Sequence, residues 1–136
     1  MATPLNQQVN NIFRDMRKKA DTLTAVIVLE TDAKLKEQSP VDSGRFRASW
    51  RVSEGEIDES VNAEANTTPQ NYNEEITAGK DYYLTNSLPY AQRLADGHSQ
   101  QAPSGWIELI AMGIEQRINQ VAEDLNRGGQ RQGDLG

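Results

Sequence analysis

The feature that most constrains this chain is an apolar repeat with a step of three or four residues over positions 5–37. Such a step gathers apolar side chains on one side of an α-helix. At 1.5 Å per residue this helix is about 50 Å long. It overhangs a domain of 136 residues, so we expect the overhang to need a partner. The repeat consists of Leu5, Val9, Ile12, Phe13, Met16, Ala20, Leu23 and Ile27.

The predicted helix has a distinctive start and middle. Thr3 is placed to cap it and Pro4 to lie in its first turn. Residues 25–29 are apolar on every side, which predicts a helical section buried all round. A β-strand is the alternative, because valine and isoleucine favour strands. We prefer the helix because the apolar step enters this section in phase and no turn signal follows it.

A first joint, residues 39–50, follows the long helix. Pro40 disfavours the α conformation at the residue before it, so the helix should end there. Asp42 and Ser43 can cap a new helical turn, and Gly44 permits tight backbone geometry. Bulky and charged side chains then alternate through Trp50. We interpret this segment as a turn followed by an anchor.

A second joint, residues 82–103, has the same ingredients. Pro89 suits the first turn of a short helix that Ser87 caps and Gly97 ends. His98 and Pro103 belong to the loop that follows.

The remaining segments predict a small sheet and a closing helix. Residues 48–57 alternate as a strand half exposed to water, with Arg51 and Ser53 on its polar face. Residues 81–86 form the second strand, and the polar segment 58–79 is an extended loop between them. An amphipathic helix capped by Ser104 closes the fold. Its apolar side holds Ile107, Ile110, Ala111, Ile114, Ile118, Val121 and Leu125.

Together these segments predict an α+β fold. It comprises a long N-terminal helix, a small antiparallel sheet with a long projecting loop, a short helix and a C-terminal amphipathic helix. We expect one domain over residues 1–127 and a flexible tail over residues 128–136, whose composition is polar and glycine-rich.

The composition narrows the functional classes. Only 36% of residues are apolar and 6% aromatic, so part of the chain is extended or part of the core forms between subunits. The absence of cysteine excludes disulfides, thiolate metal sites and cysteine nucleophiles. The N-terminus lacks the pattern of a signal peptide, and no apolar run suits a membrane helix. These features predict a soluble protein made in the cytoplasm.

The negative charge is concentrated in the middle of the chain. The net charge is −6, and residues 38–79 hold eight acidic and three basic residues, a charge of −5. An acidic chain is poorly suited to grip nucleic acid phosphates. We therefore expect it to surround DNA, if at all, without adhering.

Two motifs in order carry a family resemblance. The sequence SPVDSGRFRASW, then YYLTNSLPYAQRLADGHSQQAP and a C-terminal amphipathic helix, resembles the neck and tail-completion proteins of tailed bacteriophages, including the minor tail protein Z group. The resemblance covers residues 5–125 and is weakest over residues 58–79. It implies that the Val-Asp-Ser-Gly-Arg turn ending at Arg45 leads from the long helix into the sheet. It also implies that residues 96–103, with His98, form a structural turn.

The same resemblance implies a structural role in the virion. A member of this family would form a homo-oligomeric ring of six copies, or twelve nearer the portal, around the DNA channel. Its partners would be neck, head-closure or tail-tube proteins, and it would act without a metal or cofactor. The alternative class is a small acidic, non-enzymatic module that binds and regulates another protein.

Several side chains leave alternatives open. Arg45 and Arg47 either form a solvated pair whose stems cover Phe46 or pair with acidic residues of the next subunit. In the loop, Val61, Tyr72 and Ile76 are spaced apolar anchors, too few for a core, and are candidates for a subunit interface that orders the loop only on assembly.

Catalytic and ligand-binding interpretations are weaker. His98 has Asp96 and Ser99 beside it, but neighbours in sequence rarely converge as a triad, and no nucleophile elbow is present. The acidic residues of the loop lack the spacing of a calcium site, so we interpret them as solvated. The aromatic residues form a small core, or alternatively a base-stacking platform, which the surrounding acidic charge disfavours. These aromatic residues are Trp50, Tyr82, Tyr83, Tyr90 and Trp106.

Overall fold

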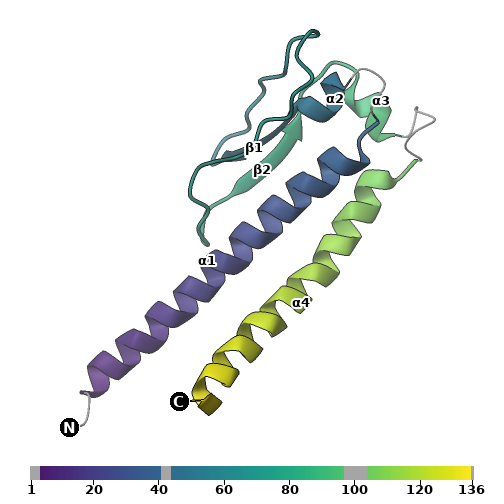
Figure 1. The fold of residues 1–136 in the computed structure, drawn as a ribbon. Coiled ribbons are helices and arrows are strands. Elements are labelled where there is room, and N and C mark those ends of the chain that lie inside the picture. The colour runs from purple at the N-terminus through teal and green to yellow at the C-terminus, as the bar shows by residue number, and fades with distance from the viewer. Residues whose placement is uncertain (1–3, 41–43, 97–103, 136) are drawn as a thin grey trace.

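The computed structural model describes residues 4–40, 44–96 and 104–135, and side chains as far as residue 127. Two long helices run side by side, and both chain ends lie at the end opposite the short helices (Figure 1). The predicted α+β fold is confirmed. The elements are α1 (Leu5–Gln38), α2 (Arg45–Ala48), β1 (Trp50–Glu54), β2 (Tyr82–Asn86), α3 (Ala91–Ala95) and α4 (Trp106–Leu135).

Helix α1 ends where the proline rule predicts. Ser39, before Pro40, has an extended backbone with φ −64° and ψ 141°. At the other end Pro4 is the N-cap residue itself, without a side-chain cap, so the placement of Pro4 inside the first turn is wrong. Residues 25–29 are helical, as predicted, but they are not buried all round. Val28 is buried while Leu29 is 45% exposed, because the body covers only one side of α1.

The two strands form an antiparallel ladder in which Trp50 pairs with Asn86 and Glu54 with Tyr82. The predicted half-exposed strand is wrong at Arg51, which is buried. The long connection covers this face of the sheet, and Thr85 donates a hydrogen bond to the Asp58 carbonyl at 3.1 Å. Residues 55–81, all of which the structure describes, contain no helix or strand, as the irregular loop prediction requires.

The core lies where the sheet meets both long helices. Phe46 packs edge-on against Trp50 and Trp106, with ring centroids 5.8 and 6.4 Å apart. Of the predicted aromatic core, Tyr90 packs against this cluster, while Tyr82 and Tyr83 are half-buried. The buried members are Leu35, Phe46, Trp50, Leu88, Trp106, Ile110 and Ile114.

The C-terminal third differs from prediction in its boundaries. Helix α3 begins after its N-cap residue Tyr90, so Pro89 precedes the helix and Ser87 does not cap it. Helix α4 continues to Leu135, whereas the composition predicts a flexible tail from residue 128. The division into a domain and a tail stays a prediction.

Candidate assembly surface

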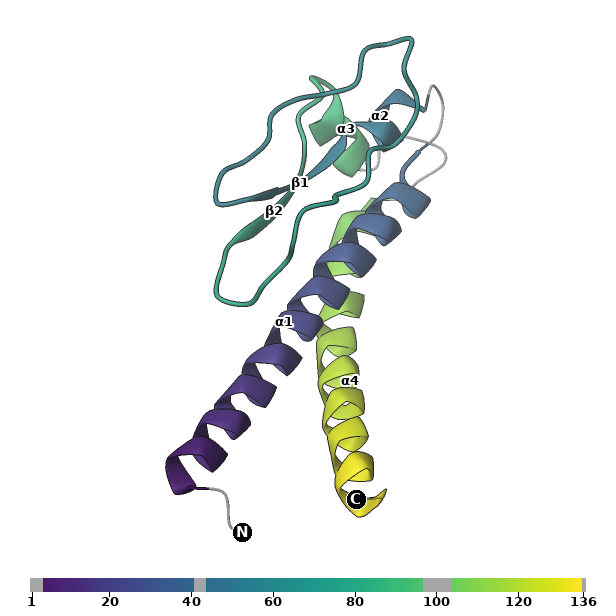
Figure 2. The same ribbon diagram turned by 60° about the vertical axis from the view of Figure 1, so that its left-hand side comes forward.

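The N-terminal half of α1 projects from the body with its apolar side uncovered. Every residue from 4 to 18 is exposed. The two long helices diverge toward the chain ends, so this part of α1 stands apart (Figure 2). Its large apolar side chains are Leu5, Val9, Ile12, Phe13 and Met16, exposed by 75, 40, 60, 63 and 58%. We call residues 5–21 the α1 arm.

The apolar side of the α1 arm continues the side of α1 that faces α4. The same step of three and four residues leads on to Ile27, which packs against the core, and to Glu30, which binds Arg117 of α4. In the sequence, α4 has no large apolar residue between Leu125 and Leu135. Its last turns therefore offer the α1 arm no apolar partner.

The uncovered area is large enough to matter energetically. The exposed fractions of the five side chains add up to about three whole side chains, each contributing about 1.5–3 kcal/mol on burial. The available gain is therefore about 5–9 kcal/mol, before the costs of association are subtracted. An exposed apolar stripe of this kind marks a surface built for a partner.

The α1 arm is also basic, in contrast to the rest of the chain. It holds four basic and two acidic residues, a charge of +2 in a protein of −6. Lys19 lies 3.3 Å from the carboxylate of Asp15. Arg14, Arg17 and Lys18 make no ion pair with any residue that the structure describes. Three cations thus accompany the apolar side chains.

The described residues of the first predicted joint follow the end of α1 that is away from the arm. Pro40 is buried, and the indole nitrogen of Trp50 donates a 2.8 Å hydrogen bond to Oγ of Ser39. Gly44 caps α2 with φ 75°, and a Cβ there would lie 3.0 Å from Cβ of Thr67, so both conformation and space favour glycine. Gly44 is itself the N-cap residue of α2, and Asp42 and Ser43, which were predicted to cap this turn, lie outside the described residues.

Of the remaining predicted joint residues, one is described and four are not. Pro89 is exposed, in the turn before α3. Asp42, Gly97, His98 and Pro103 lie outside the described residues. Their predicted roles are therefore untested.

Both arginines of the first joint contact their own chain. The Nε of Arg45 donates to the Asn62 carbonyl at 2.8 Å, and the Nε of Arg47 donates to the Lys36 carbonyl at 2.7 Å. The second bond satisfies a carbonyl in the last turn of α1. Arg45 and Arg47 therefore link segments within the chain, and their pairing with a neighbouring subunit stays a prediction.

The loop residues proposed as interface anchors face inward to differing degrees. Ile76 is buried, Val61 packs against the core and Tyr72 is half-buried. Burial raises the pKa of the Tyr72 phenol, with nearby Glu54 adding to the effect. Val61 therefore adds to the existing core, whereas Ile76 and Tyr72 are not among the described residues that form or pack against that cluster. Their assignment to a subunit interface remains untested.

Arg51 connects the loop to the sheet through hydrogen bonds, a role that was not predicted from the sequence. Its guanidinium donates to Oγ of Ser60, to the carbonyls of Ala48 and Trp50, and to Oδ1 of Asn62 at 2.6 Å. Asn62 is buried and its backbone N–H donates to Oγ of Ser49. The only signal in the sequence is an arginine on a strand face, which ordinarily predicts exposure.

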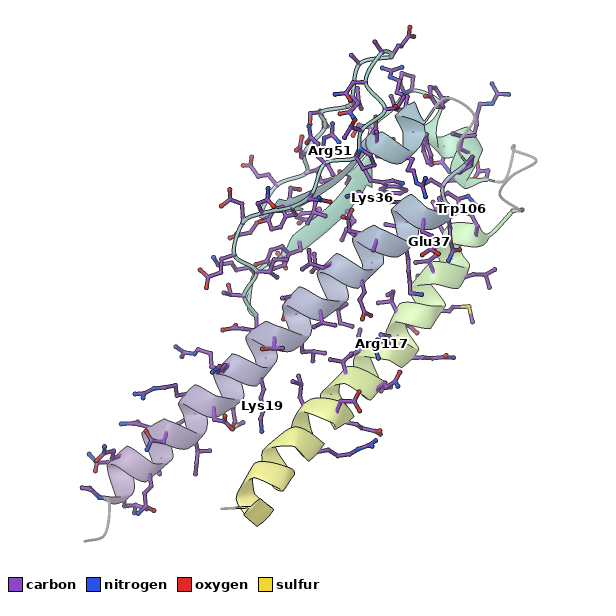
Figure 3. The ribbon with its side chains drawn as sticks, in the orientation of Figure 1. Lys19, Lys36, Glu37, Arg51, Trp106 and Arg117 are labelled. Carbon is purple, nitrogen blue, oxygen red and sulfur yellow. The ribbon has the colours of Figure 1, made fainter. Side chains whose placement is uncertain are left out.

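Two further polar links were not predicted, because each joins segments that are distant in sequence: one runs from Lys36 to the loop, and one from Arg117 to α1. Asp32 is buried and accepts from Lys36 at 2.7 Å, and Lys36 also donates to the Gln70 carbonyl in the loop. On α4, Arg117 donates two 2.9 Å hydrogen bonds to Glu30 (Figure 3). These bonds lower the pKa of Glu30 and raise that of Arg117.

Acidic side chains of the loop remain dispersed. Hydrogen bonds from the side chain and amide of Ser60 lower the pKa of Asp58. Among the described residues, no three acidic or histidine side chains are grouped so that they could hold a metal ion. In the same part of the chain, no helix has the length and apolar character needed to cross a membrane.

Comparison with protein-family models, curated proteins and solved structures found no match to this chain. The resemblance to phage neck proteins therefore rests on the two sequence motifs. The functional argument rests on those motifs and on the α1 arm.

Proposed function

We propose that this chain is a structural protein of a tailed-bacteriophage neck. It forms a ring around the DNA channel and joins or completes the tail where tail and head meet. The role is non-enzymatic, requires no cofactor and places the protein in the virion after synthesis in the host cytoplasm. Its partners are other copies of itself and neighbouring neck, head-closure or tail-tube proteins.

The observation that carries the proposal is the uncovered apolar side of the α1 arm. Five large apolar side chains on a helix outside its own domain favour burial in an assembly. A repeated contact between two different surfaces closes into a ring when the rotation between copies allows it. The two joint motifs, in this order, are the basis for assigning the chain to a phage. The α1 arm is the surface through which the chain would contact its partners.

The negative charge supports passage of DNA through such a ring. Proteins bind DNA largely through basic side chains that displace the counterions of the phosphates. A chain with a charge of −6, concentrated in the segment 38–79, gains little from this displacement. DNA would pass the ring wall without adhering. We expect no binding of the purified protein to duplex DNA at about 0.15 M salt. Fluorescence anisotropy that gives micromolar or tighter binding would contradict this part of the proposal.

The oligomeric state tests the proposal directly. Light scattering after size exclusion and native mass spectrometry should give a six-copy assembly, with twelve copies as the portal-proximal form. Electron microscopy should show rings. A monomer or dimer throughout the micromolar range would instead favour the acidic regulatory module. Head-closure or tail-tube genes beside this gene would support the neck assignment independently.

A further inference from the structure

A second uncovered apolar patch lies on α4. Leu109 and Met112 are 64 and 60% exposed, on a side of the helix away from buried Ile110 and Ile114. Exposed Glu108 and Glu115 flank the patch. Neither carboxylate forms an ion pair with the part of the chain that the structure describes. We call Leu109, Met112 and Gly113 with these two glutamates the α4 patch.

Gly113 marks this patch as a place of close approach. Glycine weakens a helix interior relative to alanine, so its presence there needs a reason. Apart from its chain neighbours and the nearby backbone of α4, no described atom lies within 4 Å of a Cβ built at Gly113, so packing against other parts of the described chain does not explain the glycine. Gly113 and Leu109 line an open groove of about 280 Å³ between α1 and α4. Its α1 wall carries Lys34 and its α4 wall carries Arg117, the latter paired with Glu30. A missing side chain beside an open groove leaves room for a side chain from another helix.

The α1 arm and the α4 patch have complementary chemistry. The α1 arm presents apolar side chains together with Arg14, Arg17 and Lys18, which form no ion pair with the described part of the chain. The α4 patch presents apolar side chains between unpaired carboxylates. Contact between two α1 arms would instead bring two surfaces of charge +2 together, which repel each other. Charge complementarity therefore favours the arm and the patch as partners.

We propose that the α1 arm of one copy docks on the α4 patch of a second copy. Phe13 lies against Leu109 and Met112 at the groove, and Arg17, one turn along α1 from Phe13, lies near Glu115. The two surfaces differ, so each copy gives one contact and receives one, as a ring requires. The inference rests on the proposed function and specifies the contact that builds the ring.

Disulfide trapping tests the contact, because the chain contains no cysteine of its own. Full-length chains carrying Phe13→Cys are mixed with full-length chains carrying Met112→Cys and oxidised under mild conditions. We expect a mixed dimer joined between positions 13 and 112. Gln7→Cys, opposite the apolar side of α1, and Ala111→Cys, on another side of α4, are exposed controls that should cross-link at least tenfold less.

The outcomes separate this inference from the proposed function. Dimers linked between two copies of position 13 show arm-to-arm pairing and overturn the inference. A wild-type ring without a 13–112 cross-link overturns the inference but leaves the ring proposal standing. A wild-type monomer without cross-links overturns both.

Gly113→Leu provides a second test that does not depend on cysteine chemistry. The built Cβ meets open space and leucine favours the helix over glycine, so the variant should keep its circular dichroism spectrum and have a thermal midpoint at least as high as that of the wild type. The larger side chain fills the docking position, and we expect association to weaken at least tenfold by sedimentation velocity. A folded Gly113→Leu variant with wild-type association would overturn the inference.

Discussion

The two halves of α1 follow the same apolar repeat but have different environments. In the C-terminal half, Val28, Asp32 and Leu35 are buried against the body. In the α1 arm, Ile12, Phe13 and Met16 are more than half exposed. The difference shows that periodicity identifies which side of a helix is to be buried, without identifying what buries it. The body half stabilises the fold, while the arm is available for assembly.

The strongest test of this difference is to truncate one large side chain in the body of the domain and one in the α1 arm. Trp106 is 2% exposed and its indole donates to the Leu94 carbonyl at 2.9 Å. Trp106→Ala should lower the free energy of unfolding by about 3–5 kcal/mol through the cavity it leaves. Urea unfolding followed by circular dichroism measures this change.

The matched arm variant is Phe13→Ala. It should change monomer stability by less than about 0.5 kcal/mol, because the Phe13 side chain is already 63% exposed. It should nevertheless weaken self-association in sedimentation velocity. A Phe13→Ala monomer destabilised as much as Trp106→Ala would show that the arm belongs to the body.

A second variant asks whether the loop belongs to the body. Arg51→Met keeps most of the side-chain length but removes the hydrogen bonds to Ser60, Ala48, Trp50 and Asn62. Leaving buried acceptors without donors should cost roughly 2–3 kcal/mol. In hydrogen exchange, the protected amides of Asn62 and Ala78 should become fast in the variant.

Arg14→Met is the control for Arg51→Met, because Arg14 is exposed and has no ion pair among the described residues. It should leave exchange in the loop unchanged. Rapid exchange of Asn62 in the wild-type free protein would restore the earlier expectation that residues 58–79 become ordered only on assembly.

Charge reversal tests whether the cations of the arm contribute to self-association. Arg17→Glu and Glu115→Lys should each weaken self-association by about tenfold, because each places like charges near the proposed contact. Combining both reversals in one chain should restore most of the affinity. Sedimentation velocity at low and high salt measures the effect. If the affinity losses of the two single variants simply add in the double variant, Arg17 and Glu115 do not interact in the assembly.

The smallest expected effect lies at the boundary between the regions, in the Glu30–Arg117 pair. The hydrogen bonds from Arg117 hold the pKa of Glu30 below its ordinary value of 4.5. Its contribution to stability is therefore present above about pH 4.5 and is lost as pH falls through the lowered pKa. Both side chains are about one-third exposed, so the effect is small. Thermal midpoints of wild type and Glu30→Gln, measured from pH 7 to pH 3, should converge on the acid side.

The helices and the strand order were predictable because they depend on local patterns. The three-four step gave α1 and α4, and Pro40 gave the end of α1. The burial of Arg51 was not predictable, because it depends on Asn62 and Ser60 folding back over the sheet. Alternation along a strand indicates two faces but cannot indicate that a polar loop covers the polar one.

The candidate surface was predictable in part. The length of α1 indicated an overhang that needs a partner, and the structure shows where its uncovered apolar side begins. The α4 patch could not be found from the sequence, since Leu109 and Met112 occur in a helix already rich in apolar residues. Only the packing of Ile110 and Ile114 against the body shows which residues remain outside.

The straightness of α1 has a mechanical consequence. The hydrogen bond from the Ala78 amide to Asp21 joins the base of the arm to the loop. From residue 21 to residue 5 the helix extends about 24 Å, so a tilt of about 10° at that bond moves the tip by about 4 Å. In the proposed ring, the length of the arm would therefore convert a small angular change at the loop into a displacement of nearly one helical turn at the tip. Substitutions around Asp21 and Ala78 are therefore the place to look for changes in the number of copies that close a ring.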